Sequence, residues 1–212
     1  MRLRAIAAAC GILVSSGLSA QQPAPAPAQI TERLDNEQVR VIVATLQPHT
    51  PSIARTGHGT NRVLIYLDDG AMTREEAGNT ARIEFRRGDV RWRPASGAYT
   101  SENVSTHPIR ILEVDLKGPP TGQAQATKID SVAVDPTHFK VLLDNEYVRV
   151  LRVHYGPHEA SKNHEHVFNR VILYLNDQPN GKADDVRMGP PRIHVEENAS
   201  DQPADAIAVE LK

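Results

Sequence analysis

Three histidines in the second half of the chain have the residue type and spacing of a metal site. His164 and His166 are separated by one residue, and residues i and i+2 of a strand point to the same side. His194 follows the turn Met188-Gly189-Pro190-Pro191 and can reach the same point from a neighbouring strand. Three neutral imidazoles suit Zn, Fe, Mn, Ni or Cu and leave coordination positions open. The sequence therefore predicts a divalent transition-metal site at these three histidines.

The polar residues around this site each have two interpretations. His158, in the preceding loop, is either a fourth ligand or a solvated loop histidine. Glu196 and Glu197 either orient the third histidine or form a solvated edge. Arg170 could bind an acidic substrate if it faces a cavity, but an exposed or salt-bridged strand arginine is the simpler expectation. Glu165 points away from its histidine neighbours, and we expect it at the surface.

Composition excludes several other kinds of chemistry. The net charge of -2 over 212 residues leaves no basic stripe for nucleic acid, and an aromatic content of 4% argues against a base-stacking surface. No Gly-rich phosphate loop and no Gly-x-Ser-x-Gly elbow is present. The single cysteine, Cys10, lies in the N-terminal segment, so no thiol nucleophile or thiolate ligand is expected. Catalytic residues stay unassigned, and no organic cofactor is indicated.

The N-terminus reads as a targeting segment. Two arginines precede a short apolar stretch at residues 5–14, and Leu18-Ser19-Ala20 is an acceptable cleavage site. Residues 1–20 are thus predicted to be a signal peptide, with an uncleaved anchor or a buried helix as the alternative. The Pro/Ala-rich residues 21–29 follow as a tether. We expect a periplasmic or secreted protein without stable membrane insertion after cleavage, because the apolar stretch is too short to span a bilayer.

The rest of the chain contains an internal repeat. The matching segments are residues 34–41 and 143–150, 48–49 and 157–158, 61–67 and 169–175, 89–91 and 185–187, 102–103 and 197–198, and 114–117 and 209–212. So many matches in one order indicate a tandem duplication. Repeat 1 is expected at residues 30–117 and repeat 2 at residues 135–212, joined by a linker at 118–134.

Each repeat has the pattern of a β domain. Residues 63–67 are an apolar run of strand length, as for a strand covered on both faces. Asp69-Gly70 and Asn180-Gly181 are hairpin turn signals. No capped helix is expected after residue 20. Short strands separated by turns favour an all-β jelly roll or barrel. Repeat 2 is shorter between its apolar strand and the Asp-Val-Arg segment, which predicts the loss of about one strand and a turn.

The combination of motifs resembles the cupin family, in which Gly and His-x-His are followed by a Glu, and a later motif has Gly, a Pro turn and His-x-x-x-Asn. The matching residues are Gly156, His164, His166, Gly189, Pro190, His194 and Asn198. The resemblance implies two tandem cupin-like jelly-roll barrels, the second one shortened. The Glu ligand of the family would fall at Arg170 or Val171, which leaves a three-histidine set.

Repeat 1 lacks this set, because its three histidine positions read Thr56, His58 and Tyr99. It is therefore expected to be a degenerate, metal-free structural copy. Its conspicuous aromatic residues, Tyr66 and Trp92, are expected in the core or at an interface.

The resemblance implies two classes of function. One is a metal-dependent enzyme of the dioxygenase or isomerase type that acts on a small oxygenated molecule. The other is a non-catalytic module, whose barrel holds a small ligand or whose duplicated sheets pair with another subunit as a homodimer. Since cupins host many functions, the fold alone does not decide between them.

Overall fold

The computed structural model describes residues 29–50, 59–95, 97, 99–123 and 126–212. The predicted signal peptide, most of the Pro/Ala tether, and Thr56 and His58 of repeat 1 lie outside the described residues. Within the described part of the chain, no helix combines the length and the hydropathy needed to cross a membrane.

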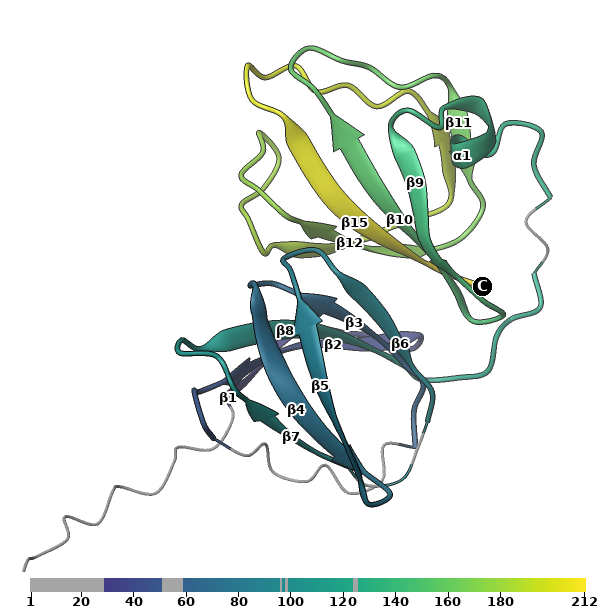
Figure 1. Ribbon diagram of the computed structural model, residues 1–212. Coiled ribbons are helices and arrows are strands. Elements are labelled where there is room, and N and C mark those ends of the chain that lie inside the picture. Colours follow the sequence, from purple (N-terminus) through teal and green to yellow (C-terminus); the bar gives the residue numbers. More distant parts are fainter. Residues whose placement is uncertain (1–28, 51–58, 96, 98, 124–125) are drawn as a thin grey trace, which may run out of the picture.

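The described chain is nearly all β, in two units that follow each other along the sequence (Figure 1). The strands of repeat 1 are β1(Gln29–Asp35), β2(Val39–Leu46), β3(Arg62–Tyr66), β4(Gly70–Glu76), β5(Asn79–Phe85), β6(Val90–Arg93), β7(Tyr99–Asn103) and β8(Ile109–Leu116). Those of repeat 2 are β9(Phe139–Asp144), β10(Val148–Tyr155), β11(His164–His166), β12(Arg170–Tyr174), β13(Val186–Gly189), β14(Arg192–His194) and β15(Ala204–Leu211). One short helix, α1(Ser131–Val134), lies between them. It begins at Asp130, whose side chain caps it.

Each unit has one large and one small sheet. The large sheets have the orders β1-β2-β8-β3-β6 and β9-β10-β15-β12-β13, so equivalent strands of the two repeats occupy equivalent positions. The small sheets are β5-β4-β7 and β11-β14. The expected all-β, cupin-like fold with two units is confirmed. The two sheets of a unit are not joined into one continuous ladder, so each barrel is open rather than closed.

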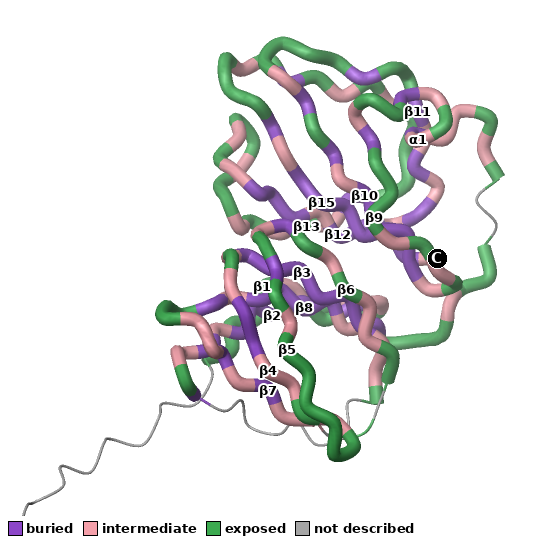
Figure 2. Tube along the Cα trace, in the orientation of Figure 1, coloured by how far each residue is buried: buried purple, intermediate pink, exposed green. Residues whose placement is uncertain are grey.

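The two large sheets face each other and share one core. Alternate side chains of each sheet enter it, because neighbouring residues of a strand point to opposite faces. Figure 2 shows buried chain from both units gathered where they meet. The fully buried members include Val41, Val63, Ile65, Leu112 and Val114 from repeat 1, and Val150, Val171, Leu173, Ile207 and Val209 from repeat 2. Trp92 packs against this core and lies 5.4 Å from Tyr147 between ring centroids.

The opposite faces of the same sheets line the interiors of the two units. In repeat 1 this second core contains Leu64, Tyr66, Met72, Phe85, Ile109 and Ile111. Residues 63–67 therefore form a strand that is covered on both faces, as the apolar run predicts.

Matching hydrogen bonds support the predicted repeat. Asn36 Oδ1 accepts from the backbone N–H groups of residues 38 and 39, and Asn145 Oδ1 accepts from those of residues 147 and 148. Asn103 and Asn198 each donate from Nδ2 to two backbone carbonyls. Both pairs of asparagines satisfy backbone groups at equivalent turns.

Three local predictions are wrong. Asp69-Gly70 is not a hairpin turn: it carries the chain from β3 into a different sheet, and a Cβ on Gly70 would lie 2.8 Å from Ser105 Oγ. By contrast, Asn180-Gly181 does lie between two paired strands, β12 and β13. Repeat 2 lacks counterparts of both β4 and β5, so the deletion removes a hairpin rather than one strand. The expectation of no capped helix after residue 20 is also wrong, because Asp130 caps the short helix α1.

Asp184 of repeat 2 ties the two units together at the edge of the shared core. Its carboxylate accepts from Arg87 and Arg110 of repeat 1, each at 2.6 Å. Asp184 has a φ of 69°, a conformation that asparagine also tolerates. We expect Asp184→Asn to keep the backbone and lower the free energy of unfolding by about 1–2 kcal/mol, because two charge-assisted hydrogen bonds are weakened at a partly solvated site.

Urea denaturation measures this loss, which should shrink at high salt. Asp201→Asn is the control, since the Asp201 side chain is 92% exposed. An equal loss in the two variants would contradict the assigned role of Asp184.

Candidate metal centre

The small sheet of repeat 2 brings the three predicted histidines together. His164 and His166 lie on β11, and His194 on β14 is the direct cross-strand partner of His164. One ring nitrogen from each histidine lies within 4.8 Å of those of the other two. His164 and His166 are buried, and His194 is half-buried. The spacing i, i+2 and the antiparallel register thus build the cluster from two short strands.

Hydrogen bonds at Nδ1 determine where the imidazole protons lie. His164 Nδ1 is 2.9 Å from the carbonyl of Lys162, and His166 Nδ1 is 2.9 Å from Glu210 Oε1. A carbonyl and a carboxylate only accept, so we assign the proton to Nδ1 in both rings. Each Nε2 atom then presents a lone pair. The two Nε2 atoms lie 3.1 Å apart, which is an unfavourable contact unless a cation lies between them.

The third imidazole has an unsatisfied nitrogen. His194 Nε2 is buried and has no hydrogen-bond partner among the described residues. Buried polar atoms normally have a partner, because burying one alone costs free energy. Two opposed lone pairs and one orphan nitrogen therefore fit a bound transition metal, which would use all three.

The environment of His164 and His194 favours the neutral imidazole, which is the form that binds metals. Burial and the nearby Arg192 lower the pKa of His194 to about 3. Burial also lowers the pKa of His164. Both side chains are thus ready to offer lone pairs at neutral pH.

A series of hydrogen-bonded charged residues holds the His166 ring in place. Glu210 is 0% exposed and accepts from His166 Nδ1 and, at 2.6 Å, from Arg149 Nε. Arg149 NH1 donates to Asp130 at 2.8 Å. Burial alone would raise the pKa of Glu210, but the hydrogen bonds from His166 and Arg149 outweigh it and lower the pKa. Glu210 is thus a charged carboxylate that orients the His166 imidazole.

The sequence did not identify this chain of residues. One signal was present: Ile207, Val209 and Leu211 alternate on one face of the last strand, which leaves Glu210 on the opposite, interior face. Arg149 and Asp130 have no comparable signal, because their partner is far away along the chain.

A cavity of about 210 Å³ lies beside His166 inside repeat 2. It exists because the interior face of β15 carries Ala204, Ala206 and Ala208. The equivalent positions of β8 carry Ile109, Ile111 and Glu113, which fill repeat 1. Tyr174 lines the cavity, whereas its counterpart Tyr66 is stacked on Phe85 of β5 at 3.9 Å. Small residues and the missing hairpin together open the second unit.

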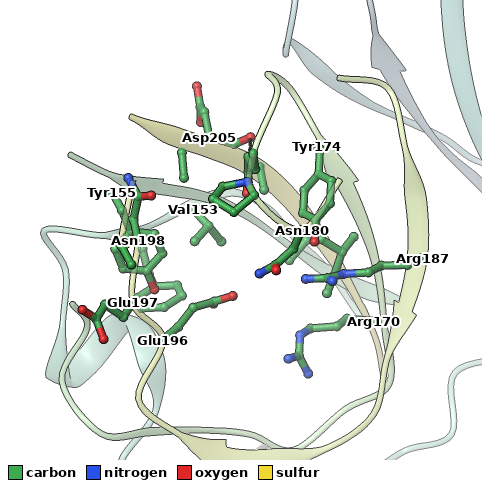
Figure 3. A pocket seen from close by; sticks show the side chains of 18 of the residues that line it. Val153, Tyr155, Arg170, Tyr174, Asn180, Arg187, Glu196, Glu197, Asn198 and Asp205 are labelled. Carbon is green, nitrogen blue, oxygen red and sulfur yellow. Dashed lines mark hydrogen bonds between the residues drawn. The ribbon is translucent and has the colours of Figure 1, made fainter. Parts of the chain in front are cut away.

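Charged side chains lie on opposite walls of this cavity. In Figure 3, Arg170 and Arg187 lie on one side, and Glu196 points toward them from the other. Arg170 is buried, so the expectation of an exposed or salt-bridged arginine is wrong. Its close partner strand explains the burial: a Cβ on Gly189 would lie 3.1 Å from Arg170 Cζ. Glu196 lies two residues after His194, beyond the end of β14, and its side chain lines the cavity.

Other predicted residues lie elsewhere. His158 is exposed and pairs with Asp201 at 2.8 Å, away from the three-histidine cluster. Glu165 is half-buried rather than at the surface, because its carboxylate accepts from Thr127 Oγ1 at 2.6 Å. Glu197 is exposed at the cavity rim.

The lowered histidine pKa values predict a pH dependence in protein from which metal has been removed. An unfolded histidine titrates near pH ~6.5. Below that pH the unfolded chain takes up protons that His194 and His164 in the folded protein do not, so stability falls as the pH drops toward 4. We expect His194→Gln to reduce this fall, measured by urea denaturation between pH 7 and pH 4. His154→Gln, at an exposed position, is the control, and an identical pH dependence in both variants would contradict the assignment.

Comparisons with known proteins agree with this geometry. No protein-family model and no curated protein sequence matches the chain. Among solved structures, it is similar to a cupin 2 conserved barrel domain protein from Leptotrichia buccalis, with 15% identity, a TM-score of 0.56, and coverage of 91% of this chain and 92% of that one.

Two further structures extend the similarity. Protein Ylba from E. coli has 14% identity, a TM-score of 0.60, and coverage of 93% and 88%. Oxalate decarboxylase from Bacillus subtilis has 12% identity, a TM-score of 0.60, and coverage of 87% and 75%. These similarities extend over both units. The sheet orders and the structural matches together show that this chain is a protein of the cupin fold.

Proposed function

We propose that this protein binds a divalent transition metal at His164, His166 and His194 and a small oxygen-containing molecule in the adjoining cavity. The observation that carries the proposal is the 3.1 Å contact between Nε2 of His164 and Nε2 of His166, beside the unpartnered Nε2 of His194. Three neutral imidazoles suit Zn, Fe, Mn, Ni or Cu. The Bacillus subtilis oxalate decarboxylase, which shares the fold, has Mn(II) centres.

The residues around such a site would have different roles. The imidazoles hold the metal, and the Lys162 carbonyl and Glu210 keep the rings in orientation. A bound metal would supply a Lewis acid or an oxygen-activating centre. The cavity places a ligand against His166, between a wall that carries Arg170 and Arg187 and a wall that carries Glu196 (Figure 3).

One feature favours an enzyme over a passive binding module. The carboxylate of Glu196 lines the same cavity, and among the described residues its side chain has no hydrogen-bond or ion-pair partner. Such a group is available to a bound ligand. We therefore propose a metal-dependent enzyme of the dioxygenase or isomerase type, with a non-catalytic ligand-binding module as the second candidate.

Metal analysis of the full chain, purified without a histidine tag, tests the proposal. Elemental analysis should find close to one metal ion per chain after incubation with Zn, Fe, Mn, Ni or Cu. His164→Ala, His166→Ala and His194→Ala should each lose it, because two imidazoles rarely retain a transition metal. His154→Gln is the matched control in the same repeat. Wild-type protein that takes up none of the five metals would overturn the proposal.

Glu210→Gln separates the supporting carboxylate from the ligands. The amide keeps the size of the side chain but removes the negative charge that His166 and Arg149 share. We expect metal affinity to fall by about 10–100-fold, since the partner of a ligating histidine typically contributes this much. Competition with a chromogenic chelator measures the change. Unchanged affinity in a folded variant would show that Glu210 serves folding alone.

A further inference from the structure

One pair of equivalent arginines, Arg62 in repeat 1 and Arg170 in repeat 2, has different partners in the two repeats. Arg62 in repeat 1 is buried and is neutralised by Glu113 at 2.7 Å and Asp115 at 3.2 Å. Arg170 is its counterpart: both are the first residue of the equivalent strand, and each faces the equivalent position of the closing strand, Asp115 or Glu210. Ala208 replaces Glu113, so one of the two carboxylates is gone.

The remaining carboxylate does not compensate. Glu210 is bound to Arg149 and His166, and no ion pair between it and Arg170 forms. Among the described residues, Arg170 donates to the carbonyl of Pro190 at 2.7 Å and has no carboxylate partner. Arg170 is nevertheless buried, with 3% of the residue exposed.

A buried cation that contacts no carboxylate is costly to keep, and Glu210 and Glu196 attract Arg170 only from beyond ion-pair distance. Burial and the neighbouring Arg192 lower the pKa of Arg170 to about 10, which still leaves it charged at neutral pH. Removing one carboxylate while keeping the cation leaves a charge that an incoming anion would neutralise.

The missing carboxylate also leaves room for an anion. Ala208, Arg170 and Arg187 line the same cavity, and both arginines lie on one wall (Figure 3). Arg187 lies over the ring of Tyr174 at 4.8 Å, which holds a second cation near the first. Low-dielectric walls strengthen the attraction of such a site for a negative group.

We propose that Arg170, assisted by Arg187, binds the carboxylate group of a small organic acid, in the position that the Glu113 side chain has in repeat 1. The planar guanidinium can donate two parallel hydrogen bonds to a carboxylate. The cavity volume of about 210 Å³ restricts the ligand to a compact acid. This proposal rests on the ligand cavity of the proposed function and names its substrate class, but it does not require the metal.

Ligand-observed NMR titrations of the full chain test it, in metal-free and in metal-loaded protein. The probes are acetate, lactate and benzoate, each compared with its neutral amide: acetamide, lactamide and benzamide. We expect at least one acid to bind, and its amide to bind at least about tenfold more weakly, because a charge-assisted pair is replaced by a neutral one.

Two variants assign the binding to the cavity. Arg170→Gln should weaken the acid by at least about tenfold. Ala208→Glu rebuilds the repeat 1 pair, so it should abolish acid binding while the protein stays folded. Arg91→Gln is the control, because Arg91 is the repeat 1 counterpart of Arg187 and is exposed outside the cavity.

The outcomes are distinct. Equal affinities for acid and amide, equal acid affinity in wild type and Ala208→Glu, or no binding of any acid would each overturn the proposal. If Arg170→Gln does not fold, Ala208→Glu and Arg187→Gln decide the same question. Acid binding in a protein that takes up no metal would overturn the proposed metal site alone, whereas metal uptake without acid binding would overturn this inference alone.

Discussion

The apolar contact between the two large sheets is the constraint on which the rest of the structure depends. Each sheet buries one face against the other unit, and about 25 cal/mol per Å² of apolar surface removed from water makes this the dominant stabilising term. Because Val63, Leu112, Val171 and Val209 serve this shared core, the opposite faces of the same strands were free to differ. One interior is filled by side chains, whereas the other combines an apolar cluster with a cavity that polar and charged residues also line.

The interiors of the two units differ although their folds correspond. Repeat 1 is packed, whereas repeat 2 contains the histidine cluster and the cavity beside it. Repeat 1 fills its interior with Ile109, Ile111 and the Arg62–Glu113 pair, and an additional hairpin covers it. Repeat 2 has alanines at the equivalent positions of β15 and lacks that hairpin. The same substitutions that remove packing create the cavity beside His166. Stability is thus supplied mainly by the shared core, and the second interior can tolerate unsatisfied groups.

The sequence predicted most of the architecture. Strand periodicity is a local pattern, and the internal repeat is found by comparing the chain with itself. The sequence also predicted that His164, His166 and His194 lie together, since the spacing of the first two follows from strand geometry. The hairpin predicted at Asp69-Gly70 is wrong. The residue types are typical of a turn, but β3 and β4, which they join, belong to different sheets. The sequence misplaced Arg170 because burial depends on Gly189 of a neighbouring strand. Glu210, Arg149 and Asp130 form a chain of contacts between distant residues, which periodicity does not reveal.

Asp130 has a consequence for the modularity of this protein. It lies in the segment between the repeats, yet it caps α1 and pairs with Arg149, which in turn holds the Glu210 partner of His166. The predicted repeat 2 therefore does not contain every residue that supports the histidine cluster. A boundary drawn at residue 135, the predicted start of repeat 2, would remove Asp130, the outermost residue in the set of contacts that supports the histidine cluster. The segment between the two repeats thus contributes a residue to the contacts around the histidines. A variant of repeat 2 that is meant to keep these contacts must include Asp130.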